Sequence, residues 1–401
     1  MGLLSSIRRL KVATLAIALI AGLVAGAVPA RATVSEAPTL LGFATGKDWR
    51  TDLPDFAKEA GKYPAFHEVF RTIDSDWTAN WLPAFYQDPH DWDMVSWLVT
   101  YVNDLDGFNQ GRYDPDLKAM VGFFKSWMSD DPTKRLVLAP FPEANLAGHP
   151  WAGDPAGYKA AFKRIHDAFR NAGLGPKRVR FAFVMNGISS SGLSYDQFYP
   201  GDTLVDILSF NKHNRNVKLS SDPAWRDYEA TFGMHIEEMQ RLISRTKPIF
   251  INQTGSVEDP DDPNRREQWI DDMFAGLKAN DQVIGAAYLD RIKQESTGTY
   301  DFRVLVDGIL DAHFAAGYAT WSSPDATAWI FDGRMDDWVA NRAATLDTGF
   351  LDVPSNHVFA DAIRWLGDSG ITQGCNPPAN DLFCPDYPLT RGQMAAMLAR
   401  G

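Results

Sequence analysis

Short apolar runs alternate with longer amphipathic stretches from Leu40 to about Tyr318, and this alternation limits the fold more than any other feature of the sequence. The stretches between the runs carry helical patterns, as in Tyr158–Asn171 and Arg266–Lys278. Buried strands that alternate with helices predict βα units and a parallel sheet. The runs are Leu40–Phe43, Phe66–Phe70, Met94–Val99, Arg135–Ala139, Val179–Val184, Val205–Phe210, Pro248–Ile251 and Val283–Tyr288.

Eight such runs in roughly 280 residues match the size of a (β/α)8 TIM barrel, an α/β fold. An open, doubly wound sheet is the alternative. That alternative is disfavoured because no Gly-rich phosphate-binding turn follows the first run. We therefore expect a barrel over residues 33–319, a linker over 320–348 and a small, mainly helical module over 349–401.

The N-terminal residues 1–32 predict a cleaved secretory signal. Arg8, Arg9 and Lys11 form a basic start, an apolar run follows over Val12–Val28, and small residues precede a cut before Thr33. An uncleaved anchor helix is the alternative, since about 17 apolar residues are close to the shortest bilayer span. Cleavage predicts a secreted protein without a membrane partner.

The charge of the chain excludes some classes of partner. The formal net charge is −12, and no basic cluster accompanies it, so we expect neither nucleic acid nor an anionic membrane as partner. No cofactor is predicted. No metal site is predicted either, because the histidines lack paired ligand spacing. The two cysteines, Cys375 and Cys384, predict a disulfide in an oxidising compartment.

Glu143 is the first candidate catalytic residue. Catalytic groups of such barrels lie where strands end, and Glu143 follows the fourth run by a few residues. Because Phe141 and Pro142 precede it, we expect partial removal from water, which favours the protonated carboxyl group. A protonated carboxyl group is the general acid that glycosidic cleavage needs. A solvated loop glutamate is the alternative.

Gln253 occupies the place where a second carboxylate is expected, at the end of the seventh run. A carboxamide carries no charge and is a poor nucleophile, so it forms no ordinary glycosyl ester. Its neutrality also removes a charge that would keep Glu143 protonated. An inverting route needs another carboxylate about 6.5–9.5 Å from the first. Asp290 and Glu258 are the candidates for it.

Other polar and aromatic residues near strand ends are candidates for sugar contact. We expect the two amides to hydrogen-bond sugar hydroxyl groups and the three rings to stack on sugar faces, with core packing as the alternative for each ring. These candidates are Asn145, Asn186, Trp97, Trp151 and Tyr288.

Residues 40–318 resemble glycoside hydrolase family 26, whose best-known members are β-mannanases. The resemblance implies a (β/α)8 barrel and a retaining mechanism with two glutamates, with Glu143 at the acid/base position and Gln253 at the nucleophile position. The family usually has His before and Met after its acid/base glutamate, where this chain has Pro142 and Ala144. The matching stretches are Pro142-Glu143-Ala144-Asn145 with Trp151, Tyr199-Pro200-Gly201-Asp202 before Val205-Asp206, and Lys247-Pro248-Ile249 before Thr254-Gly255-Ser256.

Residues 349–401 resemble one S-layer-homology repeat of the actinobacterial type. Such modules hold proteins to cell-wall polymers, so the resemblance implies attachment to the cell surface. A packing module of the same fold without wall binding is the alternative. The matching stretches are Phe350-Leu351-Asp352-Val353, Ala362-Ile363-Arg364-Trp365-Leu366, Gly370-Ile371-Thr372-Gln373-Gly374-Cys375, Phe383-Cys384-Pro385 and Leu389-Thr390-Arg391-Gly392-Gln393-Met394.

These observations predict a secreted, cell-surface glycoside hydrolase-like protein that acts on or binds a polysaccharide such as β-mannan. The first alternative is a catalytically inactive glycan-binding protein attached to the wall. The second is a purely structural role in the cell envelope.

Overall fold

The computed structural model describes residues 36–45, 49–77, 95–129, 131–217, 224–346, 349–350, 352–353, 357, 359–375, 382–385 and 387–400. The predicted secretory signal, residues 1–32, lies outside these ranges. Within them, no helix is both long and apolar enough to cross a membrane.

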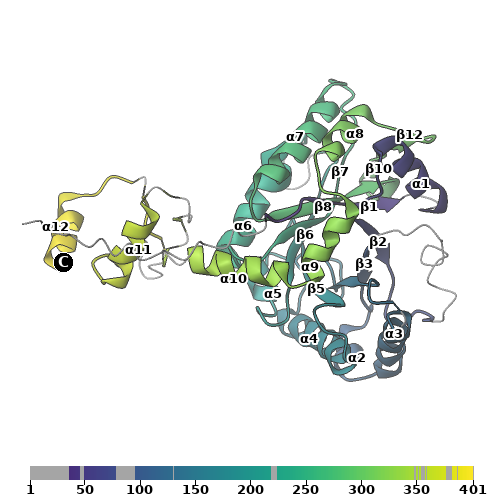
Figure 1. The fold of residues 1–401 in the computed structure, drawn as a ribbon, viewed down its shortest axis with the longest axis horizontal. Helices are drawn as coiled ribbons and strands as arrows, with labels where there is room; N and C mark the ends of the chain where they lie inside the picture. Colours follow the sequence, from purple (N-terminus) through teal and green to yellow (C-terminus); the bar gives the residue numbers. More distant parts are fainter. Residues whose placement is uncertain are drawn as a thin grey trace, which may run out of the picture. The chain divides into compact units, whose positions relative to one another are not determined.

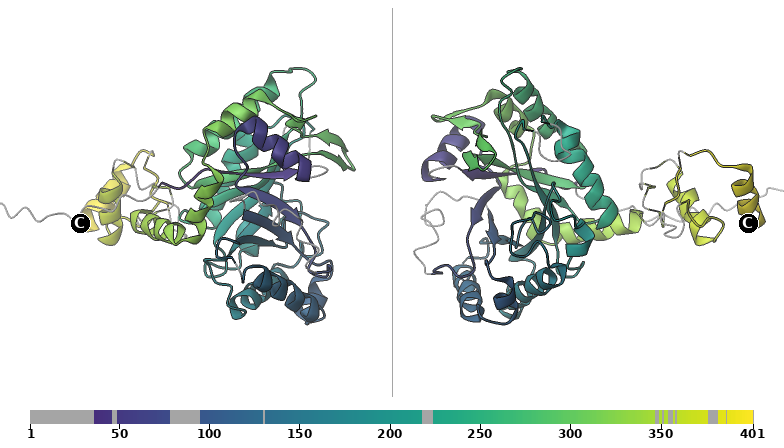
Figure 2. Two further views of the ribbon diagram at one scale, coloured as in Figure 1. Left: turned by 45° about the vertical axis from the view of Figure 1, so that its right-hand side comes forward. Right: turned by 180° about the vertical axis from the view of Figure 1, so that it is seen from behind.

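Eight parallel strands close into a barrel in sequence order, as predicted. The barrel closes because β1 pairs with both β2 and β8, for example through Gly42 with Phe66 and through Thr45 with Asp290. Figure 1 shows the strands in the centre with helices around them, and the two views in Figure 2 agree. The strands are β1 (Leu40–Thr45), β2 (Phe66–Phe70), β3 (Val95–Thr100), β4 (Leu136–Pro140), β5 (Val179–Asn186), β6 (Ile207–Asn214), β7 (Ile249–Ser256) and β8 (Val283–Asp290).

The helices bury one apolar stripe each against the strands. In α4, for example, Tyr158, Phe162, Ile165 and Phe169 are buried, which is the spacing of one helix face. The Asp154 side chain accepts a hydrogen bond from the Gly157 N–H and so caps the start of this helix. The barrel helices are α1 (Trp49–Ala60), α2 (Leu105–Asn109), α3 (Asp114–Trp127), α4 (Pro155–Asn171), α5 (Tyr195–Phe198), α6 (Met234–Leu242), α7 (Arg265–Ala279) and α8 (Ala312–Ala319).

Residues 324–346, within the segment 320–348 that we expected to be a linker, are mostly helical. They form a 3-10 turn and two helices, α9 (Ala328–Phe331) and α10 (Arg334–Leu346). Trp329, Ile330 and Phe331 are buried in one cluster with residues of the barrel interior. The segment is polar overall, but this short apolar run packs into the barrel core.

An ionic network around a buried arginine ties the same segment to β5. Arg180 donates two hydrogen bonds to the carboxylate of Asp336 in α10, at 2.9 and 2.8 Å, and one to Asp206 at 2.9 Å. Its Nε also donates to the Ile330 carbonyl oxygen at 2.9 Å. Because the guanidinium is buried, loss of either carboxylate would leave its positive charge only partly compensated.

Two hairpins follow the barrel's last strand. The first pairs β9 (Ile292–Glu295) with β10 (Gly298–Asp301), and the second pairs β11 (Leu305–Val306) with β12 (Ile309–Leu310). They occupy the connection between β8 and α8, so they extend the loop side of the barrel wall.

The C-terminal residues form a small unit with its own apolar cluster. Phe350, Val353 and Ile363 are buried together, and Phe383 packs against them. This unit contains α11 (Ala360–Asp368) and α12 (Arg391–Arg400). The predicted disulfide between Cys375 and Cys384 is confirmed.

Candidate active site

Glu143 lies just beyond the C-terminal end of β4 in an unusual backbone conformation. Its φ is 57°, and that of Phe141 is 49°, so both residues occupy the left-handed region that favours glycine. The backbone N–H of Glu143 donates to the Val184 carbonyl oxygen of β5 at 2.8 Å. Such strain persists only where the surroundings fix it, and it is concentrated at functional sites.

Three side chains hold the carboxylate of Glu143. Asn186 and Asn211 donate to Oε1 at 2.6 and 2.9 Å, and the Nε2 atom of His149 lies 3.3 Å from Oε2. These donors come from β5, from β6 and from the loop after β4.

The pKa of Glu143 is lower than its ordinary value. Burial opposes ionisation, but hydrogen bonds from His149, Asn211 and Asn186 together outweigh it. Burial raises the pKa of Glu143, as we expected from the flanking residues, but these hydrogen bonds have the larger effect. Phe141 and Pro142 indicated burial, but they do not reveal the three hydrogen-bond partners.

Gln253 lies on β7, where its side chain is nearly fully buried. Its Nε2 donates to Oε2 of Glu68 at 3.0 Å, and its side chain also forms a hydrogen bond with His213. The register pairs Gln253 with Asn211, the residue that binds Glu143. The amide is therefore fixed beside the Glu143 site by groups on β2 and β6.

Glu68 is the functional candidate that the sequence reasoning missed. It is the third residue of β2 and only 5% exposed. Burial raises the pKa of its carboxyl group to about 8, against the opposing effect of hydrogen bonds from Gln253 and Asn252. The signal available in the sequence was an acidic residue inside an apolar strand run, Phe66–Phe70.

A continuous chain of hydrogen bonds joins Glu143 to Glu68. Asn211 donates to Glu143 and accepts from Asn252 Nδ2 at 2.8 Å. The same Nδ2 group donates to Oε1 of Glu68 at 3.0 Å. Trp97 Nε1 donates to Asn252 Oδ1 at 2.5 Å, so both polar atoms of this amide have hydrogen-bond partners. Two carboxyl groups thus share one ordered polar network.

Asp290 lies at the end of β8 as expected, but its hydrogen bonds are with backbone groups of the loop after β8. Its Oδ1 accepts hydrogen bonds from the backbone N–H groups of Val304 and Leu305 at 2.6 and 2.9 Å. Burial raises its pKa to about 6, although these two bonds oppose the rise. Asp290 lines a pocket together with Asp52 and Arg303. Its contacts are those of a residue that fixes the loop after β8.

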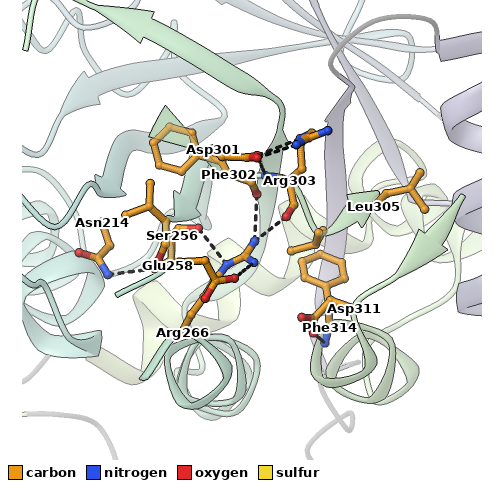
Figure 3. Close-up of polar contacts among 12 residues, drawn as sticks. Asn214, Ser256, Glu258, Arg266, Asp301, Phe302, Arg303, Leu305, Asp311 and Phe314 are labelled. Atoms are coloured by element: carbon orange, nitrogen blue, oxygen red, sulfur yellow. Dashed lines mark hydrogen bonds and ion pairs between the residues drawn. The ribbon is translucent and has the colours of Figure 1, made fainter. Parts of the chain in front are cut away.

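Glu258 lies on the surface beyond β7. Its side chain is 62% exposed, and Oε1 lies 2.5 Å from Nη1 of Arg266. Figure 3 shows Arg266 between Glu258 and the backbone around Ser256, Phe302 and Arg303. The ion pair therefore belongs to a structural cluster that fixes the loops after β7 and β10.

The two predicted amides form a pair behind Glu143. Asn145 donates to the Asn186 carbonyl oxygen and accepts from the Asn186 N–H, both at 2.7 Å. Asn145 is fully buried, so it supports the site from behind. Asn186 reaches the carboxylate itself.

The three predicted aromatic residues are buried, which favours the packing alternative over sugar stacking. Trp151 stacks on the His149 ring at 4.8 Å, and its Nε1 donates to the Pro142 carbonyl oxygen at 2.9 Å. Trp97 stacks on Phe250 inside the barrel at 4.4 Å. Tyr288 packs edge-on against a ring of α8. Trp151 and Trp97 thus contact His149 and Asn252, two polar side chains of the network around Glu143.

One group of potential metal ligands occurs in the described part of the chain, formed by Asp352, Cys375 and Cys384. Both sulfur atoms are joined in the disulfide, so they are not thiolate ligands. The Asp352 carboxylate instead accepts hydrogen bonds from the Phe383 and Cys384 N–H groups at 2.7 and 2.5 Å. This arrangement stabilises the loop that the disulfide closes.

Comparisons with known proteins support the barrel fold, and one known protein also matches in sequence. No family model matches the sequence. The chain is 28% identical over 210 residues to endoglucanase H of Acetivibrio thermocellus, a match that covers 50% of this chain and 22% of that protein. This chain therefore spans only about a fifth of that relative.

Two solved structures share the fold at low sequence identity. GH26C from Muricauda sp. MAR_2010_75 has a TM-score of 0.50 and 16% identity, over 73% of this chain and 87% of that one. A GH26 β-mannanase from Bacteroides ovatus has a TM-score of 0.50 and 14% identity, over 72% of this chain and 90% of that one. The barrel fold is thus one that glycoside hydrolases of family 26 adopt.

Proposed function

We propose that this protein binds a polysaccharide at the C-terminal face of its barrel and cleaves a glycosidic bond there, with Glu143 as a catalytic carboxylate. One observation carries the proposal. Glu143 has a left-handed backbone conformation, and three side chains donate hydrogen bonds to its carboxylate. Its side chain nevertheless remains 20% exposed. Catalytic groups of barrel enzymes lie at this face.

In this proposal Glu143 accepts and donates a proton, as a general acid/base. Its lowered pKa makes the carboxylate the resting form at neutral pH, so its first task is that of a base. His149 and Asn211 fix the direction in which the carboxylate oxygens point. Fixed geometry of this kind lowers the cost of reaching the transition state.

We propose a β-linked glucan or mannan as the substrate class. The support is the likeness to a protein named endoglucanase H and the fold shared with a protein named a β-mannanase. Both names describe enzymes that act on polysaccharide chains. An acidic chain without a basic cluster suits a neutral polysaccharide.

We also propose that the protein is exported and held at the cell wall. The support is the basic and apolar pattern of residues 1–32 and the S-layer-homology pattern of residues 349–401. The disulfide in that second segment is typical of an oxidising compartment. The partner in this proposal is a cell-wall polymer.

A second function, glycan binding without cleavage, is favoured by Gln253. The amide occupies the nucleophile position, and Glu68 and His213 hold it in place. An enzyme of the retaining type cannot form its covalent intermediate on this side chain.

Reducing-sugar release from β-mannan and from soluble cellulose tests the proposal, with amylose as the control polysaccharide. We expect turnover of one β-linked substrate by the wild type. Glu143→Gln should lower kcat by about a hundredfold or more while its calorimetric affinity for the same glycan is kept. Affinity without turnover in the wild type would favour the binding function. Absence of affinity and of turnover on all of these glycans would contradict both the cleavage function and the binding function.

A further inference from the structure

Glu68 is a carboxyl group in surroundings that do not favour a charge. It is almost fully buried, and each carboxylate oxygen accepts one amide N–H, from Asn252 and from Gln253. Within the described residues, no lysine or arginine forms an ion pair with it, although Arg291 is near enough to act through space. Burial of an acid without a cationic partner costs stability. A functional role accounts for that cost.

The position of Glu68 relative to Glu143 is the second observation. The amides of Asn211 and Asn252 link the two carboxyl groups by successive hydrogen bonds. The two groups are also close enough that the charge of Glu143 opposes ionisation of Glu68. Their surroundings drive the two pKa values apart, downward for Glu143 and upward for Glu68. This is the pattern of a base and an acid that serve one reaction.

Gln253 provides the third observation. Its Nε2 atom lies 3.0 Å from Oε2 of Glu68, so the carboxyl group absent from β7 is present one hydrogen bond away, on β2. A glutamate at position 253 would place two carboxyl groups at that distance, and both could not ionise together. The amide at 253 and the acid at 68 therefore form a matched pair.

We propose that Glu68 is the second catalytic carboxyl group of this site and the proton donor to the leaving glycosidic oxygen. The inference rests on the proposed glycoside cleavage. In the step, the bond between the anomeric carbon and the leaving oxygen breaks, and its electron pair goes to that oxygen, which takes the proton of Glu68. A water molecule forms a new bond to the anomeric carbon and gives its proton to Glu143.

The step consumes one water and forms no covalent intermediate, so the anomeric configuration inverts. Solvent then returns a proton from Glu143 to Glu68. Neither oxidant nor metal is needed for the balance. Gln253 orients the Glu68 carboxyl group and needs no charge of its own.

The experiment compares five forms of the full chain, including Gln253→Glu, on a glycan that the wild type binds. Proton NMR of the first product should show inversion for the wild type. Glu68→Gln should lower kcat by about a hundredfold or more and leave the calorimetric affinity within about twofold. The exchange variant Glu68→Gln/Gln253→Glu keeps one carboxyl group and one amide across the same contact, so it should fold, and it should recover part of the lost turnover. Glu59→Gln, at an exposed glutamate near the end of α1, is the control and should match the wild type.

Specific outcomes overturn the inference. Retention of configuration in the wild type, or full turnover by Glu68→Gln, would remove Glu68 from the reaction while leaving the proposed function intact. A wild type that binds glycan but gains turnover only with Gln253→Glu would show that Glu68 supplies no acid. A wild type without affinity or turnover would overturn the proposed function itself, and the role of Glu68 with it.

Discussion

Asn186, Asn211 and His149 decide the charge of Glu143, since burial alone would raise its pKa. The ionised group therefore stabilises the fold at pH values above its ordinary pKa of 4.5, and this contribution is lost as the pH falls through the lowered pKa. The side chain that makes the shortest of these bonds, Asn186 at 2.6 Å, is the most direct one to remove.

Asn186→Ala should raise the pKa of Glu143 and lower the free energy of unfolding at neutral pH by about 1.5–3 kcal/mol, the range for a hydrogen bond to a charged group. The acid limb of the stability curve should move to higher pH. Denaturant unfolding across pH 3–7 measures both. Asn109→Ala, which removes a hydrogen bond to the neutral Gly157 carbonyl group, is the control and should leave the limb in place. An unmoved limb in Asn186→Ala would contradict this account of Glu143.

Glu68→Gln tests the opposite shift. The folded protein holds a proton on Glu68 up to about pH 8, whereas an ordinary glutamate loses it near 4.5. Between these values the folded state binds more protons, so wild-type stability should fall as the pH rises from about 4.5 to about 8. The variant should remove that slope and exceed the wild type at pH 9 by on the order of a few kcal/mol. Equal slopes from pH 5 to 9 would contradict a raised pKa.

The strands could be predicted from the sequence because a parallel barrel buries whole apolar runs, and all eight runs correspond to strands. The place of Glu143 followed from the end of β4. Its hydrogen bond with Asn211 could not be predicted, because Asn211 belongs to another strand and meets Glu143 only after closure of the barrel. Glu68 was missed because its run otherwise reads as a buried strand.

Two further elements show where local pattern is insufficient. Asp290 lies at a strand end, but the backbone N–H groups of Val304 and Leu305 bind it, and no sequence motif announced this loop. Helix α9 is four residues long, too short for a helical period to be read. Its role depends on Trp329 and Ile330 meeting the barrel interior.

Trp329→Ala tests whether α9 belongs to the barrel. Removal of this fully buried ring should lower the free energy of unfolding by about 3–5 kcal/mol, the range for a large aromatic residue in a core. Chemical denaturation followed by circular dichroism measures the change. Trp365→Ala is the control, because Trp365 is a residue of the same type that is 61% exposed. Equal stability of both variants would contradict a core role for α9.

At the scale of the whole molecule, the chain joins a barrel with a carboxyl network to a small disulfide-closed unit. The two cysteines both lie in residues 349–401, so reduction should affect this unit alone. We expect Cys375→Ser/Cys384→Ser to lower the stability of the unit by about 2–3 kcal/mol and to weaken retention on purified cell wall. The unfolding midpoint of the barrel should not move. A barrel midpoint that falls with the disulfide would contradict separate roles.

The pH dependence of kcat/KM on the polysaccharide that the protein cleaves tests the central claim most directly. If Glu143 acts ionised and Glu68 acts protonated, activity is lost as the pH falls through the lowered pKa of Glu143 and again as it rises through about 8. The account predicts a bell with its acid limb below 4.5, the ordinary pKa of glutamate, and its basic limb near 8. Activity that continues to rise through about pH 9, or an acid limb above about pH 6, would contradict it.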